Sequence, residues 1–236
     1  MSLIKAVLFD LDDTLWPIVP VLRRAENLMY AWLADNVPDV ARRVSIDGMR
    51  ARRQELMASD PVYQLDLRVL RRTVLTEAFV EAGADPALVD CAMEVFSKAR
   101  NEVTLFEDVL PALQRLQERV ALGSVSNGVA DLHAIGLAHL FRTSMAAYRT
   151  GYAKPAPEIF LAACEALGVA ASETLYVGDD PLLDVEGAQK AGLRSVWVNR
   201  AELEPARKLP PHVKPEAIFS NLYELEQWLD GRTVKL

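Results

Sequence analysis

The sequence has few of the residues that build disulfide frameworks, zinc clusters or membrane spans. Cysteine occurs twice among its 236 residues and histidine three times. Cys91 and Cys164 both lie in helical apolar patterns, so we expect two small buried hydrophobic residues with no disulfide or zinc partner. No apolar run approaches the ~20 residues that cross a bilayer, and no signal-peptide pattern precedes the first strand pattern. We therefore expect a cytoplasmic protein without a membrane partner.

The sequence also lacks an excess of positive charge. Its 33 acidic residues outnumber its 26 basic residues, which gives a formal net charge of -7. Binding to a nucleic-acid backbone needs clustered positive charge, so no nucleic-acid partner is expected. By contrast, 51% of the residues are hydrophobic, which is enough for a substantial core in one or two domains.

Short apolar runs alternate with helical patterns over much of the chain. The first run, Ala6 to Phe9, is continuous, as in a strand that is buried on both faces. This alternation predicts an α/β fold with a parallel, Rossmann-like sheet and right-handed crossovers. Further strands are expected near residues 120–125, 144–148, 174–177, 195–198 and 217–219, and helices near residues 109–117, 156–167, 183–191 and 222–229.

One long segment interrupts the alternation with an almost wholly helical pattern. A helix is expected over residues 21–35, a second apolar face ends at Gly83, and Pro86 suits the start of a helix that runs to about residue 100. We therefore predict an α/β core catalytic domain from residues 1–15 and 105–236, with an inserted all-α domain from residues 16–104.

Polar and charged side chains follow four of the expected strands. Because the carboxyl ends of parallel strands meet at one edge of a sheet, we expect these side chains to share a site. Unit charges of like sign ~4 Å apart repel by about 4 kcal/mol at an effective dielectric constant of about 20, so clustered acids need cations. Carboxylates without a cysteine-histidine cluster favour Mg²⁺. The groups are Asp10, Asp12 and Thr14; Ser126 and Asn127; Lys154; and Asp179, Asp180 and Asp184.

In this order, the groups resemble the four motifs of the haloacid dehalogenase-like hydrolases. The resemblance covers the whole α/β domain, and the helical insertion lies where this family carries a small helical cap. The matching residues are Asp10, Asp12 and Thr14 in an aspartate-x-aspartate-x-threonine motif, Ser126 as the hydroxyl residue, Lys154 as the lysine, and Asp179 with Asp184 as the second acidic pair.

The resemblance implies a Mg²⁺-dependent phosphatase that forms an aspartyl-phosphate. Asp10 is then the nucleophile, Asp12 the general acid and base, and Lys154 the balancing charge. The substrate is expected to be a small phosphorylated metabolite, bound by a monomer or homodimer. The implied phosphate ligands are Thr14, the Ser126 hydroxyl, the Asn127 backbone N–H and Lys154, and the implied Mg²⁺ ligands are the Asp10 side chain, the Asp12 carbonyl, Asp179 and Asp184.

Several residues near these motifs have more than one interpretation. Asp13 and Asp180 stand where relatives often carry glycine and serine; they either alter metal affinity or point into solvent, and we favour solvent because acids are common in such turns. Asp184 has an alternative role at the positive end of its own helix. Trp16 either packs at the domain junction or lines the pocket.

Three arginines in the insertion, Arg68, Arg71 and Arg72, share one helix face at positions i, i+3 and i+4. This face either binds an anionic part of the substrate or lies in solvent. Neighbouring acids neutralise the segment and favour the solvated interpretation.

The position of Asp12 separates the enzymatic alternatives, because dehalogenase relatives lack an acid two residues after the nucleophile. It therefore favours phosphate over halide chemistry. A phosphomutase of the same superfamily has the same core residues and is the alternative enzyme. Phospho-acceptor signalling modules also combine aspartates, a hydroxyl residue and a lysine, but their acceptor does not follow the first strand. The intact acids disfavour a non-catalytic binding module.

Overall fold

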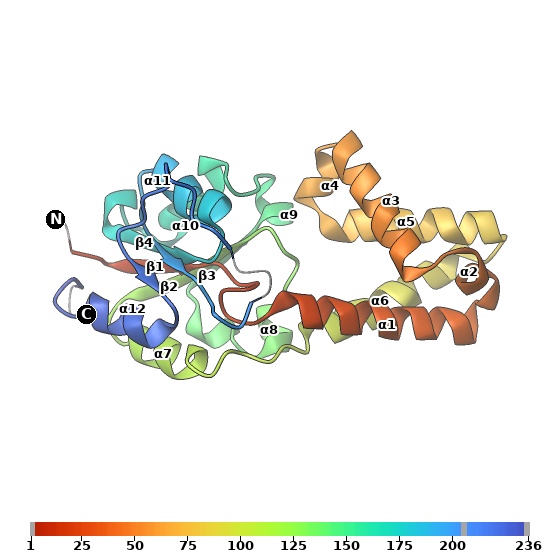
Figure 1. Cartoon of the computed structure of the whole chain (residues 1–236), viewed down its shortest axis with the longest axis horizontal. Coiled ribbons are helices and arrows are strands. Elements are labelled where there is room, and N and C mark those ends of the chain that lie inside the picture. Colours follow the sequence, from red (N-terminus) through yellow and green to blue (C-terminus); the bar gives the residue numbers. More distant parts are fainter. Residues whose placement is uncertain (1–2, 204–206, 234–236) are drawn as a thin grey trace. The chain divides into compact units, whose positions relative to one another are not determined.

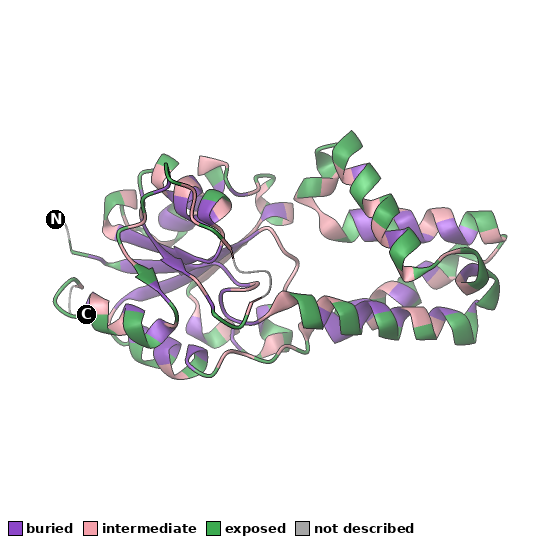
Figure 2. Cartoon of the chain, in the orientation of Figure 1, coloured by how far each residue is buried: buried purple, intermediate pink, exposed green. Residues whose placement is uncertain are grey.

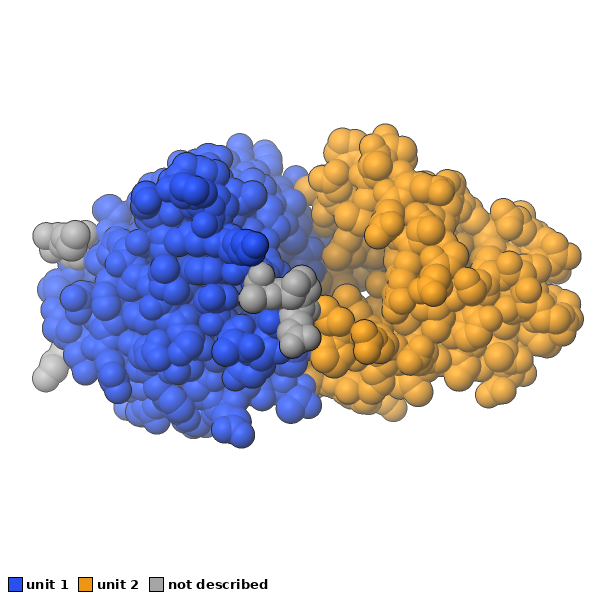
Figure 3. All heavy atoms as spheres, viewed as in Figure 1, with its two compact units in different colours: residues 1–17, 104–128, 136–236 blue, residues 18–103, 129–135 orange. Residues whose placement is uncertain are grey.

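The structure is a computed structural model that describes residues 3–203 and 207–233. The chain divides into two compact units, which Figure 3 shows in different colours. The sheet unit comprises residues 1–17, 104–128 and 136–236, and the helical unit comprises residues 18–103 and 129–135. The helical unit thus includes a short segment, residues 129–135, that the sequence did not assign to it.

Six parallel strands form the centre of the sheet unit (Figure 1), in the order β3-β2-β1-β4-β5-β6. The first strand is central and pairs with β2 on one side and β4 on the other. Short, continuous apolar runs therefore became buried parallel strands, and the predicted α/β fold is confirmed. The strands are β1 (Ala6–Phe9), β2 (Ala121–Ser126), β3 (Thr143–Ala146), β4 (Thr174–Gly178), β5 (Arg194–Val198) and β6 (Ile218–Phe219).

Helices cover both faces of this sheet (Figure 1). The helices of the sheet unit are α7 (Val109–Leu116), α9 (Ala147–Thr150), α10 (Pro157–Leu167), α11 (Gly187–Lys190) and α12 (Leu222–Leu229). On one face, Leu8 and Tyr176 pack with Phe160 of α10 in a buried apolar cluster, while α7 and α12 lie on the other face. Figure 2 shows that the central strands are buried, while the helices around them carry exposed residues on their outer surfaces.

The helical unit has a separate apolar core. In it, α1 packs along α6, and α5 packs on α2, α3 and α6. The largest buried side chains of this core include Met29, Leu33 and Phe79. As predicted, α5 ends at Gly83, whose φ of 65° suits glycine. The helices are α1 (Ile18–Asn36), α2 (Pro38–Arg43), α3 (Ile46–Ser59), α4 (Val62–Leu65), α5 (Leu67–Ala82), α6 (Val89–Asn101) and α8 (Leu132–Ile135).

Two expectations about burial were wrong. Cys164 is buried as predicted, but Cys91 is exposed because it lies off the face of α6 that carries Ala92 and Phe96. The arginine face of α5 does not lie wholly in solvent, because Arg71 is buried while Arg72 is exposed. No helix in the described part of the chain is both long and apolar enough to cross a membrane.

Candidate active site

Residues that follow β1, β4 and α9 meet in one buried cluster of the sheet unit. Asp10 follows β1, and Asp179 and Asp184 follow β4; each of the three offers a carboxylate oxygen, and these oxygens lie within 4.8 Å of one another. Lys154, in the turn after α9, donates a hydrogen bond to Asp10 and another of 2.6 Å to Asp184 Oδ1. The predicted acids and lysine therefore share one site, as expected for the carboxyl edge of a parallel sheet.

The lysine backbone is held by a side chain at the end of β2. Asn127 Nδ2 donates to the Lys154 carbonyl at 3.0 Å, and the Lys154 N–H donates to Asn127 Oδ1 at 2.7 Å. Ser126 Oγ accepts a hydrogen bond of 2.9 Å from the Gly128 N–H. The Asn127 side chain thus positions Lys154, while the phosphate contacts expected of the Ser126 hydroxyl and the Asn127 N–H stay predictions.

Tyr176, which is not among the residues predicted from the sequence, completes the surroundings of the lysine. Lys154 Nζ lies 3.1 Å from the Tyr176 hydroxyl, which donates to the Val125 carbonyl at 3.0 Å. Asp10, Asp184 and Tyr176 therefore use all three donors of the ammonium group. A signal was present, because a tyrosine inside a buried apolar strand needs a polar partner for its hydroxyl.

Thr14 lies between two of the acids. Its hydroxyl is fully buried, 3.1 Å from Asp179 Oδ1 and 3.3 Å from Asp10 Oδ2. Arg200, also buried, donates to the Thr14 carbonyl at 2.9 Å and to Asp108 Oδ1 at 2.7 Å, which fixes the loop after β1. The structure thus gives Thr14 carboxylate partners, and its role as a phosphate ligand stays a prediction.

Asp184 lies in a short π-helix, Pro181–Glu186, where the sequence predicted an α-helix from residue 183. The Asp180 carboxylate caps this helix, and the Asp180 N–H donates to Asp184 Oδ2 at 2.9 Å. Asp184 is fully buried and forms an ion pair with Lys154. It therefore belongs to the acidic cluster and also lies in the first turn of the helix. Trp197 Nε1 donates to the Asp179 carbonyl at 2.7 Å and fixes that residue from β5.

Gly178 is required by the close approach of Asp184, because a Cβ at residue 178 would lie only 2.3 Å from Asp184 Oδ2. We expect Gly178→Ala to displace Asp184, to lower the free energy of unfolding by about 1–3 kcal/mol, and to reduce turnover. Chemical denaturation and phosphate-release assays measure both effects. Gly48→Ala in α3 is the matched control, since its nearest neighbour, Ser45 Oγ, would be 3.3 Å away. Equal stability and turnover in the two variants would contradict this role.

Trp16 packs in the core and also holds the second acid of the first motif. Its side chain is fully buried, and Nε1 donates to Asp12 Oδ1 at 2.9 Å. Asp12 itself is only half-buried, unlike Asp10. The two neighbouring acids thus differ: Asp10 is paired with Lys154 in the interior, and the Asp12 carboxylate is oriented by an indole nearer to solvent.

Arg207 overturns the expectation that Asp13 and Asp180 point into solvent. Its guanidinium lies 3.5 Å from Asp13 Oδ2 and 2.9 Å from Asp179 Oδ2, and it also pairs with Asp180. Asp13 has a φ of 65°, which explains why glycine suits this position; aspartate is among the few other residues that tolerate it. No helical or strand pattern marks Arg207, which lies in an irregular stretch after β5.

Burial and mutual repulsion make the acids hard to ionise together. Loss of hydration, followed by repulsion from Asp10 and Asp184, raises the pKa of Asp179 to about 9. Loss of hydration also raises the pKa of Asp184, to about 6, although the charge on Lys154 opposes it. Loss of hydration likewise raises the pKa of Asp10. The cluster thus has more negative charge than its two cations, Lys154 and Arg207, accommodate.

A divalent cation fits this arrangement. Asp179 Oδ2 is buried and accepts no well-oriented hydrogen bond from the residues that the structure describes, despite its nearness to Arg207. The converging donors are carboxylate oxygens, which hard cations such as Mg²⁺ prefer. The donor set therefore supports a metal site at Asp10, Asp179 and Asp184.

Comparison with known proteins identifies the family. The model of the haloacid dehalogenase-like hydrolase family matches residues 4–192. The chain belongs to this family. This hydrolase is 30% identical to a phosphoserine phosphatase of Thermus thermophilus, over 94% of this chain and 97% of that relative. It is 31% identical to a glyceraldehyde 3-phosphate phosphatase of Methanopyrus kandleri, over 86% of this chain and 87% of the relative.

Solved structures of the family include both chemistries. A 2-haloacid dehalogenase from Pseudomonas syringae superposes with a TM-score of 0.89 at 36% identity, covering 97% of this chain and 99% of that one. A HAD phosphatase from Thermococcus onnurineus gives a TM-score of 0.70 at 26% identity, covering 98% and 100%. The predicted family is confirmed. The phosphatase relatives support a phosphoric monoester hydrolase.

Proposed function

We propose that this hydrolase is a Mg²⁺-dependent phosphatase that acts on a small phosphorylated metabolite through an aspartyl-phosphate on Asp10. The observation that carries the proposal is the pair of unlike acids in the first motif. Asp10 is buried beside Lys154, and Asp12 is half-buried with its carboxylate held by Trp16. A nucleophile and a separate general acid are what the two steps of phosphoester hydrolysis require.

In the first step, an Asp10 carboxylate oxygen forms a bond to phosphorus while the bond from phosphorus to the ester oxygen breaks. Asp12, protonated at that moment, gives its proton to the departing alkoxide. In the second step, Asp12 accepts a proton from the attacking water, the new oxygen bonds to phosphorus, and Asp10 is released. Lys154 keeps a positive charge beside Asp10 throughout, because attraction to Asp10 and Asp184 outweighs its burial and raises its pKa well above the ordinary value.

The metal site fits this proposal. The Asp10, Asp179 and Asp184 side chains and the Asp12 carbonyl are the groups that would hold Mg²⁺. When bound, Mg²⁺ offsets the repulsion between these acids and an incoming phosphate. A cytoplasmic location and a monomeric or homodimeric state remain predictions from the sequence.

Dehalogenation is the second candidate, because of the similar 2-haloacid dehalogenase structure. The test is to supply the purified protein with Mg²⁺ and measure phosphate release from 4-nitrophenyl phosphate and a panel of phosphorylated sugars, nucleotides and acids, beside halide release from 2-chloropropionate. We expect phosphate release only. Halide release without phosphate release would show that the protein is a dehalogenase and not a phosphatase. Phosphoryl transfer to a sugar phosphate, in place of phosphate release, would identify the phosphomutase alternative.

Metal binding should stabilise the fold more at high pH than at low pH. The metal-free native state keeps a proton on Asp179 up to about pH 9, while the unfolded chain loses it near the ordinary value of 3.8. The native state thus binds more protons, and its stability falls as pH rises through this range. Mg²⁺ removes this penalty by replacing the protons. We expect the rise in Tm on adding Mg²⁺ to be larger at about pH 8.5 than at about pH 5.5, and to be small in Asp179→Asn.

A further inference from the structure

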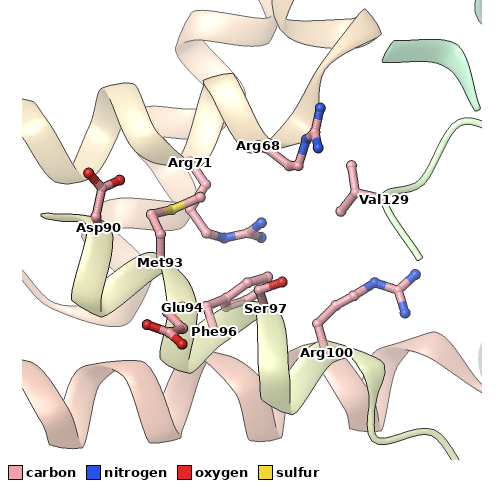
Figure 4. Close-up of a pocket in the computed structure, with 9 residues that line it drawn as sticks. All are labelled: Arg68, Arg71, Asp90, Met93, Glu94, Phe96, Ser97, Arg100 and Val129. Carbon is pink, nitrogen blue, oxygen red and sulfur yellow. The ribbon is translucent and has the colours of Figure 1, made fainter. Parts of the chain in front are cut away.

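The helical unit contains a cavity of about 310 Å³ that the proposed phosphatase site does not use. Guanidinium groups from Arg68, Arg71 and Arg100 reach it from α5 and α6, and Met93 and Phe96 supply much of its apolar wall. Figure 4 shows the three guanidinium groups pointing to the same side of the pocket, toward Val129. The pocket therefore combines positive charge with apolar surface.

Arg71 is the most unusual of the lining residues. Only 8% of the residue is exposed, and its guanidinium carbon lies 3.5 Å from the centre of the Phe96 ring. Its Nε, buried as well, donates no hydrogen bond to any residue in the described part of the chain. A buried donor without a partner is costly, so a ligand that accepts from Arg71 Nε gains a hydrogen bond that the protein alone leaves unmade.

Two acids of the helical unit, Glu26 and Asp90, form their ion pairs with arginines other than Arg71. Glu26 is buried in the same unit, but its carboxylate is held by Arg50, at 2.6 Å, and by Arg53. Asp90 pairs with Arg72 on the exposed side of α5. In Figure 4 the carboxylates of Asp90 and Glu94 lie on the side of the pocket away from the guanidinium groups. Arg68 is itself paired with Asp66, at 3.2 Å, so the positive charge near Arg71 comes mainly from Arg71 and from Arg53 and Arg100, which repel it.

Arg71 remains a cation at neutral pH although its surroundings oppose the charge. Loss of hydration, with repulsion from Arg53 and Arg100, lowers its pKa to about 9, and Glu26 opposes this shift. An anion in the pocket would relieve the same repulsion. This electrostatic gain adds to the hydrogen bond that Arg71 Nε can donate.

We propose that this pocket binds the carboxylate or phosphate group of a small organic anion, which accepts from Arg71 Nε while its apolar part packs on Phe96 and Met93. A planar guanidinium that is stacked on an aromatic ring presents its donors in a fixed direction, which suits an oxyanion. For Arg71, the proposal therefore favours anion binding over the solvated role that the sequence favoured. The proposal stands without the phosphatase mechanism, because it concerns binding within the helical unit alone.

The test uses the full-length protein with Mg²⁺ and three probes: benzoate, phenylphosphonate and the uncharged benzyl alcohol. Calorimetric titration compares the wild type with Arg71→Met, which keeps the stem but removes the charge, and with Arg72→Met, the exposed neighbour on the same helix. We expect Arg71→Met to weaken binding of benzoate or phenylphosphonate by at least about tenfold, Arg72→Met to change it less than about twofold, and Arg71→Lys to restore part of it. Benzyl alcohol should bind weakly to all of them.

A measurement on the wild type covers the case in which the Arg71 variants fail to fold. In protein labelled with ¹⁵N-arginine, the Nε–H signal of Arg71 should shift as benzoate or phenylphosphonate is added, and the Arg72 signal should not. Equal binding to Arg71→Met and Arg72→Met, or an Arg71 signal that neither anion moves, would overturn the proposal. Because neither readout requires turnover, an inactive phosphatase and an absent anion site are separate outcomes.

Rate measurements then distinguish the source of the anion. If the anion belongs to the substrate, benzoate should raise KM competitively in the wild type and not in Arg71→Met. If the anion is a separate small molecule, benzoate should bind without competing with the substrate. The relative strength of benzoate and phenylphosphonate shows whether the pocket prefers a carboxylate or a phosphate.

Discussion

Replacing Asp10 with asparagine is expected to reduce phosphatase turnover by about 10⁴-fold or more, the scale on which enzymes lose activity without their nucleophile. The amide has nearly the same shape as the carboxylate, but it is a far poorer nucleophile toward phosphorus. Phosphate release from 4-nitrophenyl phosphate at saturating Mg²⁺ measures the effect. Turnover within about tenfold of the wild type would exclude the aspartyl-phosphate on Asp10.

The same variant should keep its fold, which separates a chemical from a structural defect. Asp10→Asn removes one of two carboxylates that contact Lys154, and Asp184 still balances the ammonium charge at 2.6 Å. The loss of one buried negative charge also relieves the repulsion that raises the pKa of Asp179. We therefore expect the Tm of the metal-free variant to equal or exceed that of the metal-free wild type.

Isotope placement tests the covalent step independently of rates. In ¹⁸O-labelled water, hydrolysis of an aspartyl-phosphate by attack on phosphorus places the label in the released phosphate. Hydrolysis of an aspartyl ester by attack on the carboxyl carbon, which dehalogenation through this residue requires, places it in Asp10. Mass spectrometry of the phosphate and of the peptide that contains Asp10 reads both outcomes, and label in the peptide would contradict the phosphatase chemistry.

The sheet and the meeting of the acids were predictable because both follow from local patterns. Runs such as Ala6–Phe9 are too short for a helix and too apolar for a loop, so they mark strands buried on both faces. Parallel pairing then brings the residues after each strand to one edge, which places Asp10 near Asp179 without any knowledge of tertiary contacts. Glycine stops such as Gly83 and Gly168 are equally local.

The contacts of long side chains were not predictable, because the sequence does not show where in space the charged group at the end of the side chain lies. Arg71 and Arg72 are adjacent, and helical periodicity alone does not decide which of them turns toward the core. Arg207 reaches Asp13 and Asp180 from an irregular stretch that has no strand or helix period. The partners of Tyr176 were hidden for another reason: the residue counted as an apolar strand position, and its hydroxyl was overlooked.

Arg207 also gives a physical reason for the two unusual acids of this chain. Asp13 and Asp180 flank Asp179, and one guanidinium contacts all three carboxylates. Without Arg207, the additional negative charges would raise the energy of ionising Asp179 further. The pair of additional acids and the arginine therefore form one arrangement, in which the cation limits the repulsion close to the proposed Mg²⁺ ligand.

The Asp12→Asn variant should lose about 10²- to 10⁴-fold in turnover, the usual contribution of general acid-base catalysis. The amide still accepts the hydrogen bond from Trp16 Nε1, so the loop after β1 keeps its geometry while the exchangeable proton is lost. The loss should shrink with substrates whose leaving group needs no protonation, such as 4-nitrophenyl phosphate, and be largest with alkyl phosphates. Rates for both substrate types measure this dependence.

Asp13→Asn is the matched control for that loss. It removes a carboxylate from the adjacent residue, and asparagine tolerates the φ of 65° found there. Because Asp13 contacts Arg207 and does not face Trp16 Nε1, we expect turnover within about fivefold of the wild type. Trp16→Phe should fall between the two, since it keeps the buried ring but leaves Asp12 without its indole donor. If Asp12→Asn and Asp13→Asn lose activity equally, or if the loss is the same for alkyl and nitrophenyl esters, Asp12 transfers no proton to the leaving group.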